Sequence, residues 1–387
     1  MDSVDATPQS GAKPDAIEDF NALLALAGTH AETAEQLLAN LERIYQIASQ
    51  ADLNSYDFTV IRRAAPDLLR GTGHLRLAVR DQIPDWQKRG LMTPQVQEAL
   101  RDVFRITRYA ADMLGELTLD HQRLAPGEAP HPGFTGPASS LIFHGNTGPS
   151  PRVDFRAGDV IMVRGLFHNS AAISRGGDFD AQFSHICIVH ADATGKKWVV
   201  ESLIEEGALI KSLDDALAHG IGRAILLRHH DAGLARRAAE LIHARVARSR
   251  TSRLCHIPYD FSMRLTGYRS LFCSKLVRQA FEMASKGRIT LPTYKTTFYG
   301  ASTEFLERIG VTAKETFAPA DMELESDFEM VAEWADHRVT SDLRLQDMVL
   351  TEMFAWMRKD RWHFQEDNTI RLIGWFGRFA AHLSDDI

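Results

Sequence analysis

The middle of the chain contains five short runs of β-branched and apolar residues that follow one another with only turn residues between them. Parallel strands need a long crossover connection, so strands this closely spaced pair as an antiparallel sheet. Helical patterns follow the strands, and strands first with helices afterwards predict an α+β fold. The predicted strands span 160–163, 184–190, 197–203, 208–213 and 224–228, and the predicted helices span 231–248 and 271–285.

The composition changes on both sides of this sheet. The first residues are rich in Asp, Ser, Pro, Ala and Gly, which is typical of a disordered tail. A stretch with apolar residues at helical spacing follows and predicts a helical bundle. A segment rich in Pro, Gly and Ser then indicates a linker. The chain divides into a disordered tail (1–15), a helical bundle (16–125), a linker (126–151), a central domain (152–315) and a C-terminal helical region (316–387).

Charge and cysteine usage limit the possible partners and compartment. The net charge of −7 gives no overall electrostatic reason to bind nucleic acid. Three cysteines, an odd and sparse set, argue against a disulfide framework and for a reducing compartment. The acidic N-terminus lacks the apolar core of a signal peptide, and no run is long enough to span a bilayer. We expect a cytoplasmic protein; signal-independent secretion, peripheral membrane contact and the oligomeric state stay open.

Cys273 is a candidate nucleophile. An apolar helical stripe of Leu276, Val277 and Ala280 begins directly after it. The cysteine therefore falls in the first helical turn, where unpaired backbone N–H groups and the helix dipole favour a thiolate. The same N–H groups would donate to an oxyanion beside the sulfur. For a single cysteine, a role as a small buried hydrophobe is the alternative.

His185 and Glu201 lie in consecutive predicted strands joined by a turn. If His190 pairs with Lys196, the numbers of each residue pair sum to 386, and His185 faces Glu201 across the hairpin. A carboxylate there would orient an imidazole that acts as a base. A slip of one residue would place Glu201 on the opposite face of the sheet. A structural role is the alternative for each residue taken singly.

The other histidines do not indicate a metal site. His185 and His190 are five residues apart on one strand and so point to opposite faces. His229 and His230 have no acid or cysteine nearby at ligand spacing. We expect neither a metal nor another cofactor. Tyr259 could donate from its phenol at the active site, or it could be an ordinary packed aromatic.

Taken together, five short segments resemble the circularly permuted branch of the NlpC-type papain-like superfamily, typified by YiiX and YaeF. In unpermuted relatives the cysteine precedes the histidine, whereas here His185 precedes Cys273 by 273 − 185 = 88 residues. The resemblance covers about residues 153–300. It implies a permuted papain-like domain with an antiparallel sheet and a catalytic helix. The matching segments are Gly158–Ile161, Ser184–Val189, Val200–Ser202, Pro258–Asp260 and Phe272–Val277.

The resemblance also implies residue roles. Cys273 would be the nucleophile, His185 the general base and Glu201 the polar orienting residue. Tyr259 matches a tyrosine that lies beside the cysteine in relatives. Lys275 departs from the pattern, because relatives usually carry Glu at this position. The triad does not depend on that position, but transfer of substrate specificity does.

The resulting functional hypothesis is a bacterial cysteine hydrolase that cleaves an amide or peptide bond through a thioester, with cell-wall peptides among the substrates of relatives. A lipid acyl hydrolase or acyltransferase is an alternative, and either activity could belong to an exported effector. An inactive papain-like binding or scaffold protein is a further alternative. Several apolar residues would line a lipid channel or belong to the core: Phe167, Phe179, Phe183, Phe261, Met263 and Leu265.

Overall fold

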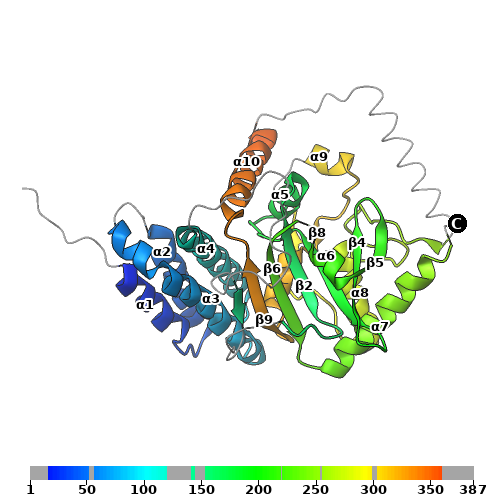
Figure 1. Cartoon of the computed structure of the whole chain (residues 1–387), viewed down its shortest axis with the longest axis horizontal. Helices are drawn as coiled ribbons and strands as arrows, with labels where there is room; N and C mark the ends of the chain where they lie inside the picture. The colour runs from blue at the N-terminus through cyan, green and yellow to red at the C-terminus, as the bar shows by residue number, and fades with distance from the viewer. Residues whose placement is uncertain are drawn as a thin grey trace, which may run out of the picture.

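The structure is a computed structural model of the 387-residue chain, shown in Figure 1. It describes residues 16–51, 56–119, 141–143, 153–218, 220–252, 255–298 and 303–359. The predicted tail at 1–15 lies outside the described residues, as do most of the predicted linker and the last part of the predicted C-terminal region.

Four helices form the N-terminal bundle, as the helical spacing predicts. They are α1 (Ala16–Ala27), α2 (Ala34–Gln50), α3 (Phe58–Lys88) and α4 (Pro94–Thr118). Thr93 caps α4 by accepting a hydrogen bond from the Val96 N–H, and Pro94 occupies the first turn. Apolar side chains from all four helices form a separate hydrophobic core, which includes Leu23, Leu41, Val79 and Phe104.

A seven-stranded sheet forms the centre of the molecule, and every pair of neighbouring strands is antiparallel. The α+β prediction is confirmed, and all five predicted strands are present. In spatial order the strands are β1 (Leu141–Phe143), β9 (Phe328–Ala335), β6 (Ile221–His229), β2 (Val160–Gly165), β3 (His185–Ala191), β4 (Lys197–Leu203) and β5 (Gly207–Ser212).

Two strands lie where the sequence analysis expected none. β9 falls in the region 316–387 that was predicted to be helical, and β1 falls in the predicted linker. Those two expectations are wrong for these stretches. In the first half of β9 the buried Phe328 and Met330 alternate with partly exposed residues, which is the period of a strand, and the last four residues of β9 are all buried. A short run of mostly apolar residues is compatible with either a helix or a strand when only its sequence is considered. Here the pairing with β6 makes the run a strand.

Two helices cover one face of the sheet. α7 (Ala232–Ser249) and α8 (Cys273–Ser285) bury apolar side chains against Val160, Ile186 and Ile188. The short helix α6 (Leu213–Leu217) contributes to the core on the opposite face. The remaining small elements are α5 (His168–Arg175), β7 (Thr296–Thr297), α9 (Thr303–Arg308), β8 (Glu315–Thr316) and the 3-10 helix η4 (Pro319–Leu324).

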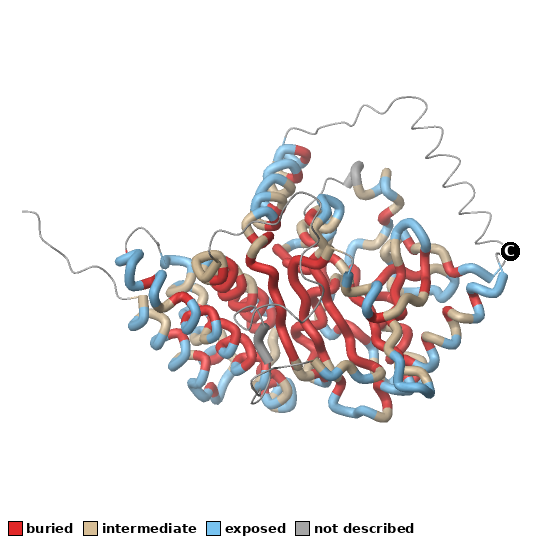
Figure 2. The backbone as a smooth tube through the Cα atoms, in the orientation of Figure 1, coloured by how far each residue is buried: buried red, intermediate tan, exposed pale blue. Residues whose placement is uncertain are grey.

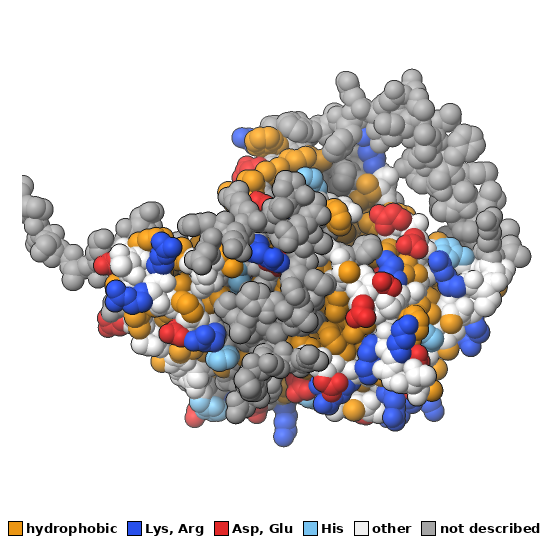
Figure 3. Space-filling model, viewed as in Figure 1, with side chains coloured by type: hydrophobic (Ala, Val, Ile, Leu, Met, Phe, Trp, Pro, Cys, Tyr) orange, Lys and Arg blue, Asp and Glu red, His pale blue; other side chains and the backbone are white. Residues whose placement is uncertain are grey.

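The helix α10 (Thr340–Lys359) packs against α5 and α4 and projects from the body of the molecule in Figure 1. Figure 3 shows hydrophobic side chains at the surface of this helix. The exposed large apolar residues of α10 are Leu345, Met348, Val349, Met353 and Trp356. Among the described residues, no helix is both long enough and apolar enough to cross a membrane.

Buried ion pairs join the bundle to the sheet. Glu333 of β9 accepts hydrogen bonds from Arg76 of α3 at 2.7 Å and from Arg108 of α4 at 2.8 Å. Arg108 also pairs with Glu323 of η4, and Arg101 of α4 pairs with Asp321 of the same 3-10 helix. Figure 2 shows that the chain is buried where the bundle meets the sheet. Charges taken out of water in this way hold the two parts in one arrangement, because each needs its partner.

We predict that Glu333→Gln lowers the free energy of unfolding by about 3 kcal/mol, because it removes the acidic partner of Arg76 and one of the two acidic partners of Arg108. Urea denaturation measures the change. The matched control is Glu240→Gln on α7, where the ion pair with Arg236 is more than half exposed on both sides. We expect that substitution to change the unfolding free energy by less than about 1 kcal/mol. Equal effects of the two variants would contradict the role of the buried network.

Candidate active site

Cys273 is the first residue of α8, as the apolar stripe predicts. Its side chain is largely buried, with 6% exposed, and the sulfur lies 3.8 Å from the Ser274 hydroxyl. The backbone of Ile186 in β3 also hydrogen-bonds to the sulfur. The sulfur therefore lies where a helix N-terminus meets β3, and both provide backbone N–H groups that favour negative charge.

The structure brings His185 and Glu201 to the same place. His185 is the first residue of β3, and its Nε2 lies 2.7 Å from Glu201 Oε2. A side-chain hydrogen bond joins His185 to Cys273 as well. Because Nε2 is engaged with Glu201, Nδ1 is the ring nitrogen available to the sulfur. A fifth of the His185 side chain remains exposed, so the site has contact with solvent.

The predicted strand register is wrong by two residues, although the face is right. β3 pairs with β4 as Ile188 with Val200 and His190 with Trp198, so paired numbers sum to 388 rather than 386. Continued outward, this register places Glu201 opposite residue 187, and His185 becomes its diagonal neighbour. An offset of two residues keeps a side chain on the same face, and diagonal partners are within reach of long side chains.

Lys211 joins the site and was missed in the sequence analysis. Its Nζ lies 3.5 Å from Glu201 Oε1, the carboxylate oxygen that does not face His185. Lys211 comes from β5, where Leu209 is directly opposite Glu201. The register of the β4–β5 hairpin would have placed Lys211 diagonally across from Glu201, on the same face.

The charged forms of Cys273, His185 and Glu201 stabilise one another. Burial works against a charged His185, but its hydrogen bonds to Cys273 and Glu201 and their charges raise the pKa of His185 to about 10. Burial also works against a Cys273 thiolate, yet His185 holds the pKa of Cys273 below its ordinary value. Glu201 is buried, and its hydrogen bond with His185 keeps its pKa below the usual range despite that burial. The two side chains therefore stabilise each other as a thiolate beside an imidazolium.

Tyr259 lies near the sulfur but is not hydrogen-bonded to it. Burial raises the pKa of Tyr259, and the negative charge of Cys273 raises it further, which indicates that the two groups are close. The Tyr259 ring meets Phe261 edge-on, with ring centroids 5.0 Å apart. Within the described part of the chain, no hydrogen bond joins the Tyr259 hydroxyl to Cys273 or His185. The Tyr259 side chain therefore lies within electrostatic range of the Cys273 sulfur and makes no hydrogen bond to it among the described residues.

Several hydrogen bonds fasten the Tyr259 segment to the residues that precede Cys273. The Asp260 N–H donates to the Leu271 carbonyl at 3.3 Å, and the Leu271 N–H donates to the Pro258 carbonyl at 3.0 Å. Ser202, next to Glu201, donates its hydroxyl to the same Leu271 carbonyl at 2.6 Å. The strand that carries Glu201, the Tyr259 segment and the start of α8 are therefore linked at one residue.

Lys275, the departure from the family pattern, has a clear structural role. Its Nζ lies 2.6 Å from Asp260 Oδ2, and both side chains are almost completely buried. The other Asp260 oxygen accepts hydrogen bonds from the Ser262 backbone and hydroxyl. The ion pair therefore ties the first turn of α8 to the residue next to Tyr259.

The remaining candidates have structural surroundings. Cys187 is buried and donates weakly to the Ile161 carbonyl at 3.7 Å, and burial raises its pKa well above the ordinary value. The His190 ring stacks on His243 at 4.0 Å, and His229 packs against Phe281. Over the described residues, no group of three or more His, Cys, Asp and Glu side chains is arranged to hold a metal ion.

We predict that Lys275→Met lowers the free energy of unfolding by about 3 kcal/mol, because Asp260 is left as a buried charge without its cation. Adding Asp260→Asn to this variant should recover at least about 1 kcal/mol, since the uncompensated charge is then removed. Urea denaturation of the single and double variants tests this. A single variant as stable as the wild type, or a double variant less stable than the single one, would contradict the assigned pairing.

The comparison with known families agrees with this geometry. Residues 154–325 match the sequence model of a family described as permuted papain-like amidase enzyme, YaeF/YiiX, C92 family. The match spans 325 − 154 + 1 = 172 of the 387 residues and includes all four predicted site residues. No curated protein and no solved structure matches the chain. The resemblance drawn from the five sequence segments is confirmed, because residues 154–325 are similar to the permuted papain-like amidases of the YaeF/YiiX type.

Proposed function

We propose that this chain is a cysteine amidase in which Cys273 is the nucleophile, His185 the general base and Glu201 the residue that orients His185. The observation that carries the proposal is the chain of contacts from the sulfur at the start of α8, through the imidazole at the start of β3, to the Glu201 carboxylate 2.7 Å away. Nucleophile, base and orienting residue in contact are the requirement for covalent catalysis of acyl transfer.

In the proposed reaction the Cys273 thiolate attacks the carbonyl carbon of an amide. The resulting oxyanion accepts hydrogen bonds from the backbone N–H of Cys273 and from the Tyr259 hydroxyl. As the C–N bond breaks, the His185 imidazolium gives its proton to the leaving amine, and a thioester remains on Cys273. His185 then takes a proton from water, the hydroxide displaces the sulfur, and the acid product leaves.

We propose a short peptide as the substrate class, with the cell-wall peptides known for relatives as the first candidates. The description of the family as amidases supports an amide over a lipid ester. The six apolar residues considered for a lipid channel do not share one environment. Phe183 is fully buried in the main core, whereas Phe167 and Phe261 have 62% and 43% of their surface exposed. This distribution supports the peptide substrate.

We predict that Cys273→Ala abolishes hydrolysis, because it removes the thiol that forms the thioester, and burial keeps the nearby Cys187 protonated by raising its pKa well above the ordinary value. The measurement is mass spectrometry of mixed peptidoglycan peptides and phospholipids after incubation with wild-type or variant protein. Wild type should shorten peptides at an amide bond and leave the phospholipids intact. Cys255→Ala is the matched control, because Cys255 is exposed and lies outside the site. Turnover that survives Cys273→Ala would refute the proposed nucleophile, and cleavage of phospholipids alone would refute the proposed substrate class.

The lowered pKa of Cys273 predicts how its alkylation depends on pH. Because the folded protein holds the thiolate below the ordinary thiol pKa, iodoacetamide should label Cys273 faster than free cysteine at about pH 6. In His185→Ala burial is opposed by the hydrogen bonds from Ser274 and Ile186 but no longer by His185, so the pKa of Cys273 rises and labelling at that pH should slow about tenfold or more. Peptide mapping separates Cys273 from the exposed Cys255, which serves as the reference thiol. An inactive scaffold would show equal labelling in wild type and His185→Ala.

A further inference from the structure

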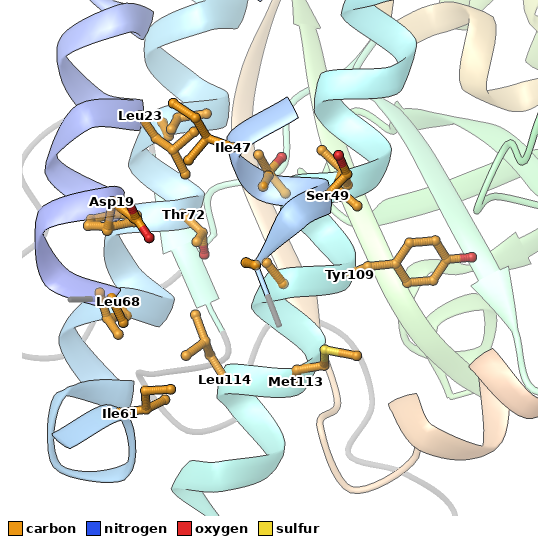
Figure 4. A pocket seen from close by; sticks show the side chains of 18 of the residues that line it. Asp19, Leu23, Ile47, Ser49, Ile61, Leu68, Thr72, Tyr109, Met113 and Leu114 are labelled. Atoms are coloured by element: carbon orange, nitrogen blue, oxygen red, sulfur yellow. The ribbon is translucent and has the colours of Figure 1, made fainter. Parts of the chain in front are cut away.

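The N-terminal bundle contains an apolar cavity of about 300 Å³ that is separate from the Cys273 site. Figure 4 shows side chains from α1, α2, α3 and α4 around it. An engineered apolar cavity of about 150 Å³ admits benzene. The bundle cavity is therefore large enough for a molecule of roughly ten to twelve non-hydrogen atoms. Its lining includes Leu23, Ile47, Ile61, Leu68, Met113 and Leu114.

The charged side chain of the cavity lining is at the side of α1. Tyr56 donates a hydrogen bond to Asp19 Oδ2 at 2.6 Å, and both residues line the space. Among the described residues that line it, Asp19 is the charged one, and no lysine, arginine or histidine is present. A carboxylate without a lining cation accepts hydrogen bonds and attracts positive charge, but it repels an anionic head group.

The bundle is closely packed beside this space. The Phe20 ring lies so near Gly71 of α3 that a Cβ atom at Gly71 would come within 2.3 Å of it. Tyr109 contributes to the cavity wall, but Figure 4 shows its ring pointing away from the space, and its hydroxyl donates to Asp180 of the central domain. Helix interiors normally close over voids of this size. An apolar space that persists among well-packed helices is the form that small-molecule sites take.

We propose that this cavity binds a small aliphatic molecule with a hydrogen-bond donor at one end, namely a medium-chain alcohol or amine. The hydrocarbon fills the space between the four helices, and the hydroxyl or ammonium group donates to the Asp19 carboxylate. Burial of the chain against apolar walls supplies the affinity. The acidic side chain supplies the selectivity, because the anion of a fatty acid would meet Asp19 with no cation to offset it.

The test uses the 387-residue chain and 1-naphthylamine, a fluorescent aromatic amine of about eleven non-hydrogen atoms whose emission changes when it enters an apolar site. We expect saturable binding at one site per chain. 1-Decanol and decylamine, below their aggregation concentrations, should displace the probe at concentrations at least about tenfold lower than decanoate. Displacement by decanoate as effective as displacement by decylamine would overturn the proposal, as would no saturable binding of the probe.

Two cavity-filling variants locate the site. Ala110→Phe places a ring inside the cavity and should weaken probe binding about tenfold or more, whereas Ala78→Phe makes the same change at an exposed position of α3 and should not. Met113→Trp is the second filling variant, at a lining residue with 41% of its surface exposed. If Ala110→Phe fails to fold, Met113→Trp tests whether the probe binds in this cavity. Unchanged binding by a folded filling variant would overturn the proposal.

Asp19→Asn tests the head-group contact. This variant should weaken displacement by decylamine about tenfold while changing displacement by 1-decanol much less, because only the amine carries a charge. An unchanged preference for decylamine over decanoate would show that Asp19 is not the recognition group. These experiments measure binding and not hydrolysis. The proposed cavity ligand and the proposed amidase activity can therefore be refuted independently of each other.

Discussion

The active-site geometry depends on the contact between Cys273 at the start of α8 and His185 at the start of β3. Each side chain makes the other's charged form more stable: the imidazolium lowers the pKa of the thiol, and the thiolate helps raise the pKa of the imidazole to about 10. Burial alone would leave both groups neutral. The pair persists because Glu201 holds the far side of the imidazole, and Lys211 in turn lies against Glu201.

The surrounding structure keeps these groups in place. The α7 and α8 helices pack against one face of the sheet. This packing fixes the position of Cys273, at the start of α8, next to β3. Ser202 and Asp260 converge on Leu271, two residues before the cysteine, and the Lys275–Asp260 pair fixes the first turn of α8 from the other side. Lys275, where the resemblance implies a glutamate, therefore forms an ion pair with Asp260 beside the candidate site. The bundle, joined to β9 through Glu333, covers one edge of the same sheet.

Much of this arrangement could be predicted from local sequence patterns. The stripe after Cys273 places it at a helix start, and the alternating runs give the five strands from β2 to β6. The face of the sheet shared by His185 and Glu201 was also predictable. Side chains alternate between the two faces along a strand, so a register error of two residues leaves each side chain on the same face. The strand β9 was not predictable, since its eight residues acquire their character from pairing with β6. Lys211 was also within reach of sequence reasoning, because the β4–β5 hairpin places it beside Glu201. The arginines that hold Glu333 were not, because they are distant from it in the sequence and only the packed fold brings them together.

The most direct test of the central claim is the ionisation of Cys273 itself. The thiolate absorbs in the ultraviolet, so the difference in absorbance between wild type and Cys273→Ala, followed across pH, reports its titration. The paired thiolate and imidazolium predict a midpoint below the ordinary thiol pKa, and a shift to higher pH when His185 is replaced by Ala. A midpoint at or above the ordinary thiol value, unmoved by that replacement, would contradict the account.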